Sequence, residues 1–127
     1  MRILYLGLLW VATMLWAAGA QAGAADVVNA QMAASTNGMY RFDVTIRSRD
    51  TGWDGYADAW RIESPDGTVL GTRTLAHPHV NEQPFTRSLS GVKIPTGVKR
   101  VTIRAHYSKA GWAKAGWDGE ILTITVP

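Results

Sequence analysis

The feature that most constrains the fold is a two-residue alternation of apolar and polar side chains, which is clearest in residues 40–48. Apolar side chains occupy the even positions from Tyr40 to Ile46, and Arg, Asp or Thr occupies the positions between them. Because successive side chains of a strand point to opposite faces, this alternation predicts a strand with one buried face. No helical apolar period over three turns follows the first two dozen residues, so the sequence predicts an all-β domain.

Six further segments are predicted to be extended, and Gly, Pro, Asp or Asn separates them. The turn Ser64-Pro65-Asp66-Gly67 is typical of these boundaries, because proline presets the backbone angle at the second position of a β-turn. Short strands at near-regular spacing predict an immunoglobulin-like or fibronectin type III-like β-sandwich of about seven strands, with a small barrel as the alternative. The predicted strands cover residues 27–33, 40–48, 56–63, 68–76, 85–94, 98–107 and 120–126.

The first 22 residues have the pattern of a secretory signal peptide. Arg2 is followed by an uncharged, mostly apolar run from Ile3 to Ala20, and small residues in an Ala-x-Ala arrangement end at Ala22. We expect a signal-peptide helix over 1–22, cleavage after Ala22, and a single domain over 23–127. An uncleaved anchor is the alternative, because the run approaches the ~20 residues that a spanning helix needs. The absence of cysteine excludes a lipid anchor of the cysteine type and any disulfide.

The charge pattern argues against a nucleic-acid partner. The net charge is +3, and the basic residues are scattered among acidic ones at alternating strand positions. Such a distribution is typical of a solvated sheet face, whereas nucleic-acid binding needs a basic stripe. We therefore expect a periplasmic or secreted protein with an unknown protein or small-molecule partner, no nucleic acid and no stable membrane anchor after cleavage.

The segment His77-Pro78-His79 is the most unusual in the chain. Residues two apart in an extended segment project to the same side, so the two imidazoles could face one metal ion. Glu82 follows one short turn later, and His106 is the remaining histidine, expected to face away from the core. Imidazole and carboxylate ligands suit Zn²⁺ or Cu²⁺. The alternative is that the two histidines only bond backbone groups in a loop between strands.

Tryptophans in glycine-rich loops form a second candidate binding surface. Trp53-Asp54 and Trp117-Asp118 each lie within a Gly-Trp-Asp-Gly turn. An exposed indole can stack on a sugar ring or a peptide while the neighbouring carboxylate accepts hydrogen bonds. Equally, these indoles could fold back over the open end of the sandwich.

Catalysis has little support, because there is no cysteine, no Gly-x-Ser-x-Gly turn, and no spacing that selects a pair of acids. Asp58 is expected to share the inward face of Trp60 and to meet Arg73 or Arg87.

Several motifs resemble a family of short, exported, functionally uncharacterised proteobacterial proteins. The resemblance spans roughly Val44 to Val126, nearly the whole predicted mature chain, and its motifs lie in residues 52–54, 56–58, 65–67, 70–73, 77–79 and 82–89. It implies export and a β domain, and it implies no activity. Its members carry further histidines, one of them at the position of Gly55, so this chain departs from the pattern in a way that weakens a metal site.

Together these observations predict a non-catalytic, exported β-sandwich that serves as a binding or accessory protein. The expected working surface combines the loop 77–82 with Trp53, Asp54 and His106. The alternative is a divalent metal binding protein that uses His77 and His79.

Overall fold

The computed structural model describes residues 24–114 and 119–127, and this part of the chain is all β. All seven predicted strands are present, and a two-residue strand, β7, adds to them inside the loop predicted between residues 108 and 119. The predicted signal peptide lies outside the described residues. The strands are β1 (Ala25–Ala34), β2 (Met39–Ser48), β3 (Ala57–Glu63), β4 (Val69–Thr74), β5 (Phe85–Lys93), β6 (Arg100–Tyr107), β7 (Gly111–Trp112) and β8 (Leu122–Thr125).

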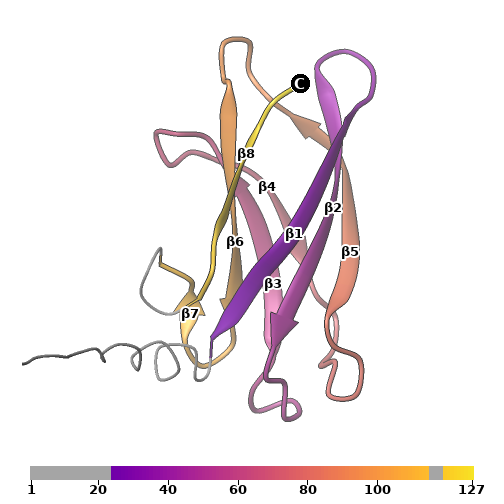
Figure 1. Cartoon of the computed structure of the whole chain (residues 1–127), viewed down its shortest axis with the longest axis vertical. Helices are drawn as coiled ribbons and strands as arrows, with labels where there is room; N and C mark the ends of the chain where they lie inside the picture. The colour runs from indigo at the N-terminus through magenta and orange to yellow at the C-terminus, as the bar shows by residue number, and fades with distance from the viewer. Residues whose placement is uncertain (1–23, 115–118) are drawn as a thin grey trace, which may run out of the picture.

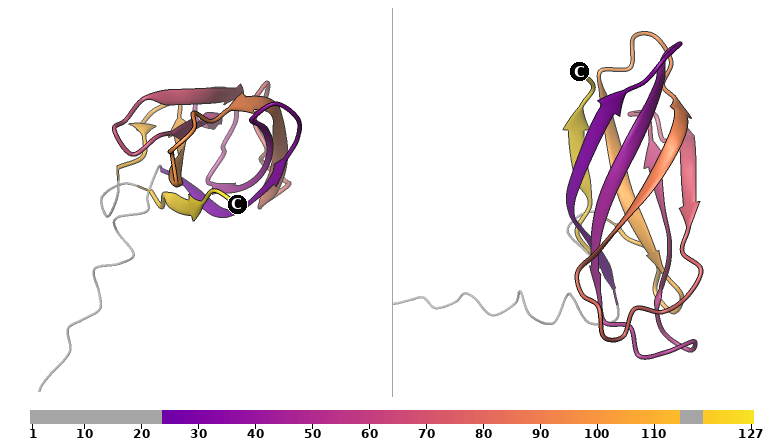
Figure 2. Two further views of the ribbon diagram at one scale, coloured as in Figure 1. Left: turned by 90° about the horizontal axis from the view of Figure 1, so that it is seen from above. Right: turned by 90° about the vertical axis from the view of Figure 1, so that its right-hand side faces the viewer.

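The strands form two antiparallel sheets that face each other (Figure 1). One sheet has the order β1-β2-β5, and the other has the order β4-β3-β6 with β7 and β8 beyond β6. Seen from above, the sheets curve around a shared interior (Figure 2). The prediction of an all-β sandwich is therefore confirmed.

β7 and β8 together make one interrupted edge strand. Both pair with β6: Trp112 lies opposite His106, and Leu122 lies opposite Ile103. Residues 113–121 separate the two strands along the chain, and residues 115–118 of this stretch lie outside the described residues. The interruption leaves β7 with two residues, which is why sequence periodicity predicted only the longer part, β8.

The core follows from the alternation in the sequence. Phe42, Val44 and Ile46 of β2 are fully buried, and Trp60 of β3 is equally inaccessible. Burying such a side chain contributes roughly 1.5–3 kcal/mol, so a few of them supply the main driving force for folding. The predicted burial of Trp60 is confirmed.

The sandwich has two ends with different loops. We call the end that holds the segments 49–56 and 75–84 the loop end, and the end that holds the turns 64–68 and 94–99 the pocket end. In Figure 1 the loop end lies at the bottom and the pocket end at the top.

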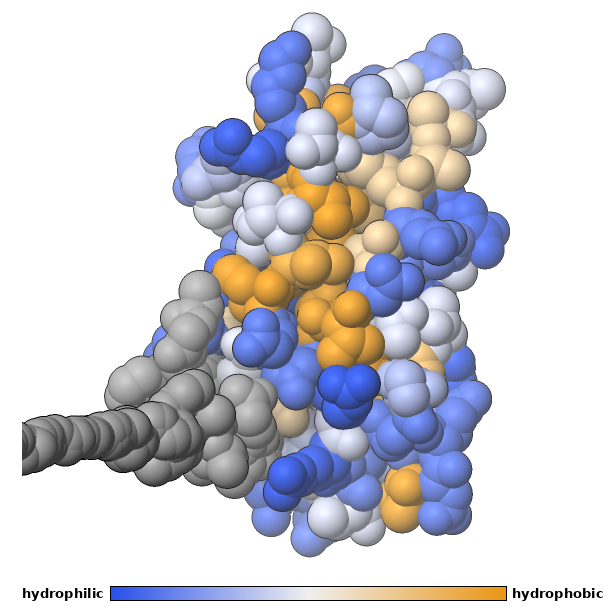
Figure 3. Space-filling model, viewed as in Figure 1, coloured by the Kyte–Doolittle hydropathy of each residue, from blue (hydrophilic) through white to orange (hydrophobic). Residues whose placement is uncertain are grey.

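A seam between β1 and the C-terminal segment closes one side of the sandwich. The Val27 amide donates to the Glu120 carbonyl at 3.0 Å, and the Glu120 amide donates to Asp26 Oδ1 at 2.8 Å. Figure 3 shows apolar side chains gathered on this side of the molecule. Met32 of β1 and Ile124 of β8 are among the partly buried residues that pack on the core here. Within residues 24–114 and 119–127 there is no helix long and apolar enough to cross a membrane.

Candidate functional site

One buried carboxylate joins the two long segments of the loop end. Asp50, which is 8% exposed, accepts hydrogen bonds from the Ser48 hydroxyl at 2.6 Å and the Ala57 amide at 3.0 Å through Oδ1. Its Oδ2 accepts the amide of His79 at 2.8 Å. Because Asp50 belongs to the segment 49–56 and His79 to the segment 75–84, the bond between them fixes one segment against the other.

Gln83 links the segment 75–84 to the end of β2. Its Oε1 accepts the Ser48 amide at 2.8 Å, and its Nε2 donates to the His79 carbonyl at 3.0 Å. The Tyr107 hydroxyl donates to the Arg49 carbonyl at 2.7 Å and so holds the start of the first segment to β6. The loop end is therefore a preorganised surface.

His79 is a buried, neutral histidine. Its ring stacks on Phe85 with centroids 3.8 Å apart and planes 8° from parallel. Arg87 Nη2 lies 2.8 Å from His79 Nε2, and a guanidinium can only donate, so Nε2 accepts and the proton is on Nδ1. Burial is the largest cause that lowers the pKa of His79, and the charges of Arg87 and His77 lower it further.

His77 and Glu82 lie beside His79 on the exposed side. The two imidazole rings are 4.6 Å apart, and His77 Nδ1 is 2.9 Å from the Pro78 carbonyl, to which it donates. Glu82 Oε1 is 3.5 Å from Arg87 Nη2 and 3.9 Å from His79 Nε2. Three of the predicted ligands are thus neighbours, but a guanidinium occupies the free nitrogen of His79.

His106 belongs to a different surface, on the outer face of the second sheet. Its Nδ1 is 2.5 Å from Asp58 Oδ1, and its ring meets Trp112 edge-on with centroids 4.8 Å apart. The prediction that His106 faces away from the core is confirmed. The expected inward position of Asp58 is wrong, because β3 and β6 change register between Ala57 and Ala59, and this irregularity turns Asp58 outward.

These placements bear on the predicted metal site. In the two described stretches, no group of three or more His, Asp or Glu side chains is arranged to hold a metal ion. His77, His79 and Glu82 are close together, whereas His106 is bonded to Asp58 on the sheet face. The four predicted residues therefore do not converge.

Trp53 is the most exposed large apolar side chain of the described residues, at 70%. It lies in a tight turn closed by the Thr51 amide donating to the Gly55 carbonyl at 2.9 Å. Its ring meets Tyr56 edge-on, with centroids 5.5 Å apart, and exposed Asp54 follows it in the turn. The indole therefore projects into solvent and does not cover the end of the sandwich. Trp117 and Asp118 lie outside the described residues.

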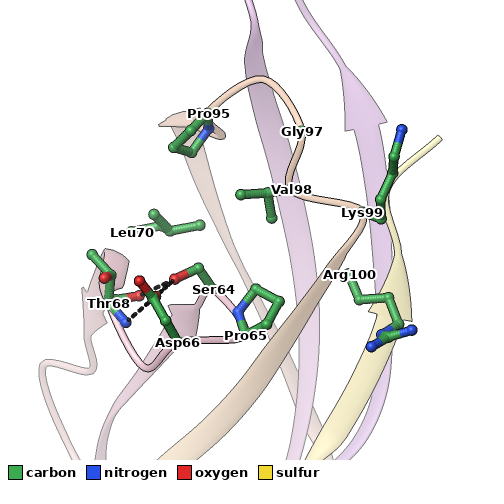
Figure 4. Close-up of a pocket in the computed structure, with 10 residues that line it drawn as sticks. All are labelled: Ser64, Pro65, Asp66, Thr68, Leu70, Pro95, Gly97, Val98, Lys99 and Arg100. Carbon is green, nitrogen blue, oxygen red and sulfur yellow. Dashed lines mark hydrogen bonds between the residues drawn. The ribbon is translucent and has the colours of Figure 1, made fainter.

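Sequence reasoning missed two features of the structure. It does not identify Asp50 and Gln83 as linking residues, because nothing in the local pattern reveals that they bond to distant parts of the loop end. A cavity at the pocket end was also missed. It lies between Leu70 of β4 and Val98 of the β5–β6 turn (Figure 4). The sequence marks this cavity only by the Pro-Asp-Gly and Pro-Thr-Gly turns, which indicate β-turns and not a binding site.

Fold and surface together define a small all-β sandwich with a rigid, aromatic loop end. No family model matches the chain, and no solved structure matches it. A protein of the archaeon Halomicrobium mukohataei, described as "Putative lipoprotein", is 38% identical over 88 residues. The match covers 69% of this chain and 43% of the relative, so the chain spans less than half the length of that protein.

Proposed function

We propose that the protein is an exported, non-catalytic binding module whose loop end contacts a ligand with flat apolar faces and hydroxyl groups, such as a sugar chain. The observation that carries this proposal is the exposed indole of Trp53 on a turn anchored through Asp50. An aromatic side chain held out in water has apolar area to lose when a ring stacks on it. The adjacent Asp54 carboxylate would accept hydroxyl hydrogen bonds.

Three observations support export and the architecture. The first 22 residues have the signal-peptide pattern, and the archaeal relative is described as "Putative lipoprotein". A sheet of β1-β2-β5 facing a sheet of β4-β3-β6 has the strand order of a fibronectin type III-like domain. Domains of this architecture present binding loops at the ends of a rigid sandwich. We extend the proposal to a periplasmic or secreted location on this basis.

The contacts of His106 assign this residue to the surface of the second sheet. Asp58 orients this imidazole as an acid orients the base of a hydrolase. However, among the hydrogen bonds of residues 24–114 and 119–127, none joins a serine or threonine hydroxyl to His106. The neighbours of His106 are instead Asp58 and the ring of Trp112, so the pair supports the sheet surface.

A glycan titration of the purified protein tests the loop-end proposal. We expect saturable binding to at least one soluble oligosaccharide in a broad panel. Calorimetry measures the affinity. Trp53→Ala should weaken binding about tenfold or more, because each tenfold change in affinity corresponds to about 1.4 kcal/mol and a stacked aromatic supplies this much. Val69→Ala removes an exposed apolar side chain at the opposite, pocket end and should leave the affinity unchanged. No binding across the panel, or equal binding by Trp53→Ala, would contradict the proposal.

Metal binding is the second candidate, and the closeness of the His77 and His79 rings is the observation that favours it. A metal ion at His79 Nε2 would have to displace Arg87, whose positive charge also repels it. We therefore expect only weak Zn²⁺ or Cu²⁺ binding by the wild type in calorimetry. Arg87→Gln should strengthen it, and His77→Ala with His79→Ala should abolish it. Tight, saturable binding by the wild type that this double variant loses would make metal binding the better function.

A further inference from the structure

The pocket end contains a cavity of about 530 Å³ with mainly apolar walls. It lies between the β3–β4 turn and the β5–β6 turn, and Figure 4 shows Leu70, Val98, Pro65 and Pro95 around it. Leu70 and Val98 are partly exposed side chains at the margin of the core. The volume is within the range of ~300–1,000 Å³ that is usual for small-molecule sites.

The acidic residue of the cavity is committed to its own turn. Asp66 Oδ1 accepts hydrogen bonds from the Ser64 hydroxyl and from the Thr68 amide, the latter at 3.1 Å. These bonds lower the pKa of Asp66 to about 2, with the Ser64 bond as the largest cause. Asp66 therefore stabilises the hairpin, and its carboxylate is turned toward the donors of that hairpin (Figure 4).

Two cations stand at the side of the cavity away from Asp66. Lys99 and Arg100 both line it at the rim, and their charged ends are directed outward from Leu70 and Val98 (Figure 4). In the described part of the chain, neither side chain forms an ion pair or a hydrogen bond, whereas Arg61, Arg87 and Arg104 are each paired with a carboxylate. The rim thus carries two cations that form no ion pair within residues 24–114 and 119–127.

We propose that this cavity binds a small amphipathic anion. Its apolar body, a short acyl chain or fused aromatic rings, lies against Leu70 and Val98, and its carboxylate or sulfonate reaches Lys99 and Arg100. Apolar walls with a few charged groups at one side fit such a molecule, because the walls supply affinity and the cations select the sign of the head group. This site lies at the opposite end from the proposed glycan surface and does not depend on it.

Fluorescence titration with 8-anilinonaphthalene-1-sulfonate tests the proposal on the purified protein. We expect saturable enhancement by the folded protein, with one site per chain. Octanoate should displace the probe, and octylammonium, which has the same chain and the opposite charge, should not. High salt should weaken binding, because exposed charges are screened. Binding only to vesicles of anionic phospholipid, with none to the free probe or octanoate, would overturn the proposal in favour of a membrane surface.

Two variants separate the charged and apolar contributions. Lys99→Gln with Arg100→Gln should weaken probe binding about tenfold, which corresponds to about 1.4 kcal/mol. Lys109→Gln with Arg49→Gln makes the same change in net charge at the loop end and should leave binding unchanged. Val98→Trp should fill the cavity and abolish binding, whereas Val80→Trp on the loop end should not.

Near-ultraviolet circular dichroism of each variant checks that the fold is retained, because a loosened core would also bind the probe. Unchanged affinity in both Lys99→Gln/Arg100→Gln and Val98→Trp, with the native spectrum retained, would overturn the site. Loss of probe binding in Val98→Trp, with unchanged binding in Lys99→Gln/Arg100→Gln, would overturn the role of the two cations.

Discussion

At the scale of single residues, His79 shows how burial changes the chemistry of a side chain. The sequence presented it as a candidate ligand, since histidines two apart on an extended segment share a side. In the fold it stacks on Phe85 and accepts a hydrogen bond from Arg87. The pairing of these side chains could not be predicted, because it depends on how the β4–β5 segment folds over the end of β5.

His79 should make the stability of the protein depend on pH. Its folded pKa lies below the unfolded value of 6.5, so the folded state disfavours the proton. The stabilisation is fully present above pH 6.5 and is lost as the pH falls toward the folded pKa. The groups that face the ring include Arg87 and His77, which oppose protonation, and Glu82 and Asp50, which favour it.

We expect the free energy of unfolding to fall between pH 8 and pH 5, as measured by urea titration. In His79→Gln, which has no ionisable group at this position, the fall should be smaller. Val80→Gln serves as the control, because it changes an exposed side chain next to His79 without adding or removing an ionisable group. An identical fall in the wild type and His79→Gln would show that His79 is not the titrating group.

At the scale of elements, the strands could be predicted well and their irregularities could not. Alternation located every strand of four or more residues, because one face of each is buried and the other is solvated. Asp58 was misplaced because the register change in β3 leaves no mark on the local pattern. β7 was missed because two residues are too few for a period.

The two loop-end segments are connected mainly through Asp50, so we expect Asp50→Ala to destabilise the domain. It leaves the Ser48 hydroxyl and the Ala57 and His79 amides without their acceptor. A hydrogen bond to a charged group contributes roughly 1.5–3 kcal/mol, so the loss should reach about 3 kcal/mol or more in urea unfolding. Asp54→Ala removes the same side chain from an exposed position nearby and should cost less than about 0.5 kcal/mol. Equal effects of the two substitutions would refute the linking role.

At the scale of the whole molecule, the closing seam depends on close backbone contact at Gly119. A Cβ atom at this position would lie 2.7 Å from the Ala25 carbonyl oxygen and 2.9 Å from the Ala113 Cβ. Its φ of +140° is also strained for any residue with a side chain. The sequence showed Gly119 only as part of a turn, since a contact between the two ends of the chain has no local signature.

Gly119→Ala should therefore open or strain the seam between β1 and the C-terminal segment. We expect a loss of about 2–3 kcal/mol in thermal or urea unfolding. Gly111→Ala is the matched control, because Gly111 also has positive φ but no atom lies within 4 Å of the added Cβ. The loss of stability in Gly111→Ala should be about 1 kcal/mol, which is the cost of placing a side chain at positive φ. Equal losses would show that backbone strain alone, and not contact at the seam, explains the effect.

The described chain enters at the loop end, where β1 begins, and leaves at the pocket end, where the C-terminus lies (Figure 1). The first and last long strands belong to different sheets. Tension applied between residues 24 and 127 would therefore run along the strands and load the β1–β2 ladder in shear. Hydrogen bonds that lie perpendicular to the strands must then yield together, and not one after another as in unzipping. Between residues 24 and 127 the domain therefore resists tension through many hydrogen bonds at once.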